Sequence, residues 1–137
     1  MDDTLKDMRD VTILCNDKTF ECHKVVLSCR SRIFKAMFNL ESANEIKTRK
    51  VNINDFEPET IETMLSFLYF GKILDAEKIT SDLLRLADKY DIVGLLEQIT
   101  NYLQENLRVE TALDIMVAAH QTNQKVLFDS SVKFLYW

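Results

Sequence analysis

The segment spanning residues 10–38 changes its hydrophobic period once, and this change restricts the folds open to the chain. Apolar residues first alternate, as in a strand with one buried face: Val11, Ile13 and Cys15. Residues 16–18 form a turn signal, and a return strand follows at residues 19–22. Apolar residues then recur at helical spacing: Val25, Val26, Cys29, Ile33, Phe34, Met37 and Phe38. The pattern predicts a β-hairpin that runs directly into helices.

The rest of the chain predicts more helix than strand. Short strands are expected at residues 51–53 and 72–74. Pro58 suits the first turn of a helix, where its missing N–H costs nothing, and Gly71 suits a left-handed helix end. Four further segments show helical spacing: 79–90, 92–103, 109–119 and 126–135. We therefore predict the α+β class, with a small sheet flanked by helical hairpins.

Composition narrows the classes of function. A chain of 137 residues with 47% hydrophobic and 28% charged residues suits one soluble domain. The net charge of −5 argues against a nucleic-acid surface, which needs a basic patch to meet phosphates. The sequence opens acidic rather than with a secretory signal, and its apolar runs are too short to span a bilayer. The three cysteines lack a disulfide spacing, which favours a reducing compartment.

The residue types that carry chemistry form no catalytic or metal-binding pattern. Cys15, Cys22 and Cys29 lie seven apart, whereas zinc sites use closer pairs with suitably placed histidines. We expect all three cysteines to be small core residues. A catalytic pair of Cys22 with His23 remains an alternative, although neighbours on a strand point to opposite faces. The sequence therefore predicts no enzyme, no metal and no cofactor.

Six motifs occur in a characteristic order, at residues 10–11, 20–27, 30–34, 37–38, 67–73 and 83–90. Together they resemble a BTB/POZ domain over residues 10–107. The resemblance implies the BTB/POZ fold and a module for protein–protein association. We expect this domain at residues 1–107, including an N-terminal dimerisation segment. A C-terminal helical pair at residues 108–137 is expected to belong to the same globular unit.

Within that family, residues 51–59, 87–90 and 106–112 are most similar to the BTB part of speckle-type POZ (MATH-BTB) proteins. This resemblance implies a homodimeric substrate adaptor for a cullin-3 RING ubiquitin ligase, in the nucleus or the cytoplasm. Its partner would be the cullin-3 N-terminal domain, and a domain absent from this chain would bind the substrate. The alternative is a BTB assembly module of a transcription regulator that recruits corepressors without binding cullin.

The resemblance also suggests where a second copy would bind. The segment before the hairpin and the first helix carry surplus apolar residues and a charged pair. We expect the dimer interface at Leu5, Met8, Asp10, Lys24 and Val26. Asp10 and residues 23–24 correspond to a partly buried charged pocket of the BTB dimer. A buried carboxylate needs a partner, so Asp10 requires Lys24 or backbone donors.

A second set of residues corresponds to the cullin-binding face of such adaptors. These adaptors carry a large hydrophobic residue, any residue and then glutamate in the loop after the second helix. The nearest match is Ala43 and Glu45, and Leu40 or Ile46 takes the hydrophobic position if the register differs. Tyr90 joins this face by burying its ring and exposing its hydroxyl to a partner. Alanine buries little area, so binding is expected to be weaker than in adaptors with a larger residue there.

Overall fold

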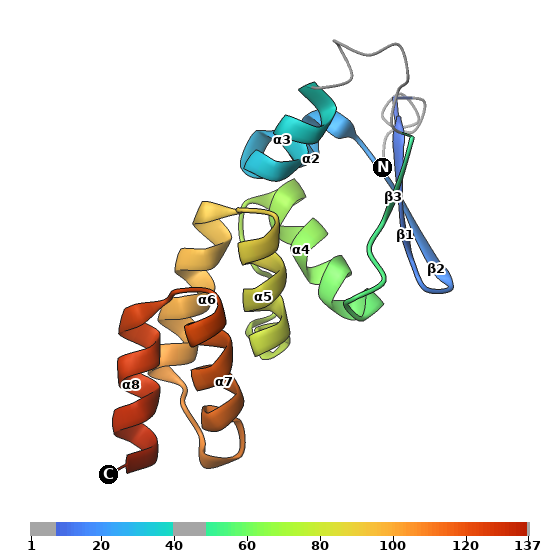
Figure 1. Cartoon of the computed structure of the whole chain (residues 1–137). Coiled ribbons are helices and arrows are strands. Elements are labelled where there is room, and N and C mark those ends of the chain that lie inside the picture. Colours follow the sequence, from blue (N-terminus) through green and yellow to red (C-terminus); the bar gives the residue numbers. More distant parts are fainter. Residues whose placement is uncertain (1–7, 40–48, 137) are drawn as a thin grey trace.

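The computed structural model describes residues 8–39 and 49–136, and it has the expected α+β architecture (Figure 1). Its sheet has the order β2-β1-β3. Strand β1 (Val11–Cys15) pairs antiparallel with β2 (Lys18–Cys22) and parallel with β3 (Lys50–Asn52). The predicted hairpin and the strand near residue 51 are therefore confirmed.

Helices make up most of the described chain. After the hairpin come α2 (Lys24–Arg30), α3 (Arg32–Asn39), α4 (Pro58–Phe70) and the short 3-10 helix η2 (Ala76–Lys78). They are followed by α5 (Ser81–Lys89), α6 (Val93–Glu105), α7 (Val109–Gln121) and α8 (Lys125–Tyr136). Within the described residues, none of these helices is long and apolar enough to cross a membrane.

The elements follow one another along the molecule. Figure 1 shows the sheet with α2 and α3 at one end, α4 to α6 in the middle, and α7 with α8 at the other end. The pair α7–α8 packs on the pair α5–α6, with α7 against α5 and α8 against α6. One continuous core joins all of them, from Ile13 in the sheet through Met64 and Leu86 to Ile115 and Leu127. The apolar positions of α5 and α6 are buried in this core as their helical spacing predicts, whereas most of those in the last helix are exposed: Val126, Val132, Phe134 and Leu135.

The signals at the two ends of α4 are confirmed, but the strand expected after it is wrong. Pro58 lies in the first turn of α4. Gly71 ends the helix with a φ of 78°, and its N–H donates a 2.7 Å hydrogen bond to the Phe67 carbonyl. Residues 72–74 form bends instead of a strand, because no described strand lies beside them and Leu74 faces solvent.

Candidate protein-interaction surfaces

The corner between the hairpin and α2 is fixed by a carboxylate. The first backbone N–H groups of a helix have no partner within the helix, and His23, at the N-cap of α2, makes no side-chain cap. Asp10 lies just before β1, and its Oδ1 accepts a 2.8 Å hydrogen bond from the Lys24 backbone N–H. The Lys24 ammonium lies over the Phe38 ring, 5.4 Å from its centroid. The described partner of Asp10 is therefore the backbone N–H of Lys24. The Asp10 carboxylate is exposed in the single chain.

The same corner is tied to α4 through Tyr69. The Tyr69 hydroxyl oxygen accepts a 3.0 Å hydrogen bond from the His23 backbone N–H and lies 2.7 Å from His23 Nδ1. His23 is buried, so both contacts are shielded from water. Burial raises the pKa of Tyr69, which keeps the hydroxyl protonated. The start of α2 is thus held in place from two sides.

The outward face of α2 and α3 carries an exposed apolar surface. Val25 and Cys29, four residues apart on α2, are exposed, as is Ile33 at the start of α3, and Val25 is 69% exposed. Val26, the residue named from the sequence, is half-buried and packs against the core. Its place in the interface stays a prediction. Val25 is not among the predicted interface residues, although its position two residues before the buried Leu27 places it on the opposite side of the helix.

The rest of the predicted interface lies in the segment before the hairpin. Met8 is 63% exposed, which leaves an apolar side chain available to a second subunit. Leu5 lies outside the described residues. The dimer residues therefore remain a prediction, with Met8 and the α2–α3 face as its described part.

The three cysteines occupy different environments. Cys15 and Cys22 are buried as expected, but Cys29 is exposed because it shares the outer face of α2 with Val25. The expectation of a core position for Cys29 is therefore wrong. Burial raises the pKa of Cys22 to about 11, and its Sγ donates to the Phe20 carbonyl at 3.5 Å. A thiol in that state is a weak nucleophile at neutral pH.

Metal-ligating side chains are not clustered in the described part of the chain. No group of three or more histidine, cysteine, aspartate or glutamate residues there is arranged to hold a metal ion. His23, one of the few candidate ligands, instead faces Tyr69.

The turn after α5 is fastened to α3. Tyr90 stacks on Phe34, with ring centroids 4.6 Å apart and planes 10° apart. The Ser31 hydroxyl donates a 2.6 Å hydrogen bond to the Tyr90 carbonyl and accepts one from the Phe34 N–H. Tyr90 is only 5% exposed, and its burial raises the pKa of the phenol. Its ring is buried as expected, but it offers little surface in the single chain, so its contact with a partner stays a prediction.

The C-terminal helical pair is attached to α5 by polar contacts. Arg85 Nε donates a 2.9 Å hydrogen bond to Gln121 Oε1, and the Arg85 guanidinium lies 3.4 Å from Asp114. The Ser81 hydroxyl donates to the same aspartate. Because Ser81 meets Asp114 and Arg85 meets Gln121, α5 and α7 run in the same direction, and the last residue of α7 lies beside the middle of α5.

The predicted cullin-binding loop starts directly after α3. Its residues Leu40, Ala43, Glu45 and Ile46 lie outside the described residues. The neighbouring helix α3 is described. It ends at Asn39 and is joined to the Tyr90 turn by the contacts above. The role of the loop residues therefore remains a prediction, but the helix from which the loop starts is described.

Comparisons with known proteins agree with this architecture. A family model described as "BTB/POZ domain" matches residues 2–107. A solved structure, the BTB domain of zebrafish PATZ1, is 20% identical and superposes with a TM-score of 0.61, covering 72% of this chain and 77% of that one. At this identity the solved structure shows a shared fold. BTB domains are protein-interaction modules that generally form homodimers. With a family model matching most of its length, this chain belongs to the BTB/POZ family.

Proposed function

We propose that this chain is a homodimeric adaptor that links the cullin-3 N-terminal domain to a substrate held by another domain, in the nucleus or the cytoplasm. The adaptor catalyses nothing and acts by raising the local concentration of substrate at the ligase. Its dimer contacts involve Met8, the corner at Asp10 and Lys24, and the apolar face of α2 and α3. The similarity of residues 51–59, 87–90 and 106–112 to speckle-type POZ proteins supports the cullin assignment.

One structural observation carries the adaptor proposal. Three segments that the proposed cullin face needs are fastened to one another: α3, the Tyr90 turn and α7. Ser31 bonds the Tyr90 carbonyl at 2.6 Å, and Arg85 bonds Gln121 at 2.9 Å. A rigid face of this kind lets a partner bind without paying to order it. We expect the loop at residues 40–46, which follows α3 in the sequence, to complete this face.

Titration calorimetry with the purified cullin-3 N-terminal domain tests this proposal. We expect binding by the unmodified chain, tighter binding by Ala43→Met and weaker binding by Glu45→Ala, since an apolar anchor dominates such interfaces. Lys125→Trp places a bulky side chain at the start of α8, beside the α7–α8 turn, and should block docking. Lys133→Trp, two turns further along the same exposed helix, is the matched control and should bind normally.

Two outcomes of these measurements would contradict the proposal. No heat with the unmodified chain and none with Ala43→Met contradicts the adaptor role. The family's other use, homotypic assembly without cullin, then becomes the better account. Equal losses for the two tryptophan variants would contradict the proposed location of the face.

A further inference from the structure

A groove of about 880 Å³ lies at the end of α5 opposite the Tyr90 turn. It is bounded by η2, the start of α5, the end of α6 and the start of α7, and we call it the α5–α7 groove. Its volume is within the range of about 300–1,000 Å³ that is usual for binding sites. Because α5 has nine residues, roughly 13 Å of helix separates this groove from Tyr90. The groove thus lies at the opposite end of α5 from the Tyr90 part of the predicted cullin face.

The floor of the α5–α7 groove is apolar. Ile79 and Leu107 line it as half-buried side chains, and the buried Leu103 and Ile115 lie beneath. These residues come from the segment before α5, from the end of α6 and its following loop, and from α7. An apolar side chain of a ligand that entered the groove would therefore leave water.

The rim of the same groove is acidic. Glu77, Asp82, Glu105 and Asp114 all line it, whereas Arg108 is the one basic residue that the described part of the chain contributes to the lining. The rim therefore has an excess of negative charge over a low-dielectric floor, a combination that concentrates cations.

The four rim carboxylates differ in their partners. Arg85 compensates two of them, lying 3.0 Å from Asp82 and 3.4 Å from Asp114. Among the residues that the structure describes, the carboxylates of Glu77 and Glu105 form no ion pair. The uncompensated charge of the groove therefore sits on these two exposed glutamates, one from η2 and one from the last turn of α6.

The dipoles of the helices that end or begin at the groove also favour a cation. The last turn of α6 carries no basic residue, so the negative end of its dipole reaches the groove without compensation from its own helix. The helices α5 and α7 begin there, but their first turns contain Asp82 and Glu110, which offset the positive ends. The groove is accordingly suited to a cation rather than to an anion.

We propose that the α5–α7 groove docks an extended basic segment of a partner protein. Lysine or arginine side chains of that segment would meet Glu77 and Glu105, and an apolar side chain between them would cover Ile79 and Leu107. Charge complementarity and the apolar floor together select this class of partner. This docking adds to the dimer and to the cullin face and does not depend on either.

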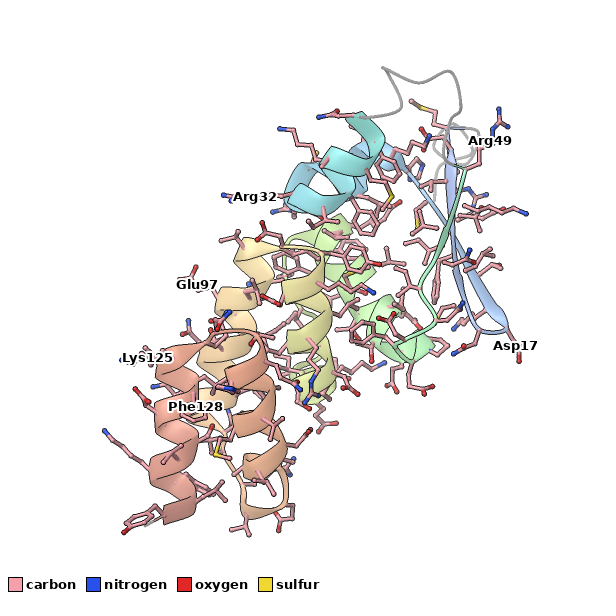
Figure 2. The ribbon with its side chains drawn as sticks, in the orientation of Figure 1. Asp17, Arg32, Arg49, Glu97, Lys125 and Phe128 are labelled. Atoms are coloured by element: carbon pink, nitrogen blue, oxygen red, sulfur yellow. The ribbon has the colours of Figure 1, made fainter. Side chains whose placement is uncertain are left out.

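The test uses fluorescence anisotropy with the unmodified chain and a short labelled peptide in which lysine alternates with leucine and serine. We expect saturable binding that weakens with added salt. The double variant Glu77→Lys/Glu105→Lys should bind at least about tenfold more weakly, because two close charge pairs become repulsive. Glu97→Lys is the matched control, since Glu97 lies on α6 and Figure 2 shows it pointing outward from the helices. Its affinity should be unchanged.

A second arm tests the floor. A peptide in which serine replaces every leucine should bind distinctly more weakly, and so should the variant Leu107→Ser with the original peptide, because both remove apolar contact. Circular dichroism confirms that each variant is folded. Equal affinity of the double variant, an equal loss for Glu97→Lys, equal binding of the leucine-free peptide, or tighter binding of an acidic peptide of the same spacing would each overturn the proposal.

Discussion

The Asp10 carboxylate caps α2 through the backbone of Lys24, with a distance of 2.8 Å between Oδ1 and the amide nitrogen. A residue placed before β1 thereby bonds the first amide of the helix that follows β2. A negative charge at this position also suits the helix dipole, since the first turn of α2 contains no acidic residue of its own. The hairpin and α2 consequently form one unit, and the proposed dimer face is built on it.

Removal of this cap should lower stability. Asp10→Ala is expected to cost about 1 kcal/mol of unfolding free energy, as for other helix caps. Asp10→Asn keeps an oxygen acceptor and should cost less. Urea denaturation followed by circular dichroism measures both variants. An alanine variant as stable as the unmodified chain would show that the hydrogen bond contributes nothing.

Loss of the Tyr69 hydroxyl should also be costly. Tyr69→Phe leaves the buried His23 amide without its acceptor, and an unsatisfied buried donor costs roughly 1–3 kcal/mol. Tyr136→Phe, at a position that is 83% exposed, is the control and should change the unfolding free energy very little. Identical denaturation midpoints for the two variants would contradict the tie between α2 and α4.

The ring stack beneath the Tyr90 turn should dominate its stability. Phe34 is fully buried and stacks on Tyr90, so Phe34→Ala is expected to cost about 3–5 kcal/mol. The matched control is Phe70→Ala, because Phe70 is exposed at the end of α4. Thermal unfolding compares the two alanine variants. A similar small effect at both positions would show that the stack does not hold α3 on α5.

The thiols should differ sharply in reactivity. The pKa of Cys22 is raised to about 11 by burial, so at pH 8 only roughly one molecule in a thousand carries the reactive thiolate there. Burial raises the pKa of Cys15 as well, and Cys29 is exposed. In the monomeric Val25→Lys variant, where the proposed dimer face is uncovered, a colorimetric thiol assay should therefore detect one fast-reacting thiol, absent once Cys29→Ser is added, and three in denaturant. Three fast thiols without denaturant would contradict the burial of Cys15 and Cys22.

The local elements could be predicted from the sequence because their signals are local. The alternation in residues 11–15, Pro58, Gly71 and the helical spacing of the later segments depend only on near neighbours in the chain. The strand expected at residues 72–74 failed for a related reason. A run of three residues carries no information about whether another strand lies beside it.

The interaction surfaces could be predicted only in part. Val25 and Val26 both fit the helical spacing of apolar residues, and only tertiary packing decides which of the two faces solvent. The bond between Tyr69 and His23 joins residues 46 positions apart, and the parallel pairing of β3 with β1 also joins residues far apart in the sequence, such as Thr12 and Lys50. No local signal encodes such pairings. The charge of the α5–α7 groove likewise arises from four separate elements.

Sedimentation velocity at micromolar concentration tests the central claim, a homodimer built on the outer face of α2. The unmodified chain should give a sedimentation-derived mass of twice the 16.0 kDa of one chain. Val25→Lys should sediment as a folded monomer, since a twofold interface repeats the added charge in both halves. Val126→Lys, at a position 67% exposed on α8, is the matched control and should remain a dimer. A monomeric unmodified chain, or a Val25→Lys variant that dimerises as well as the control, would contradict the account.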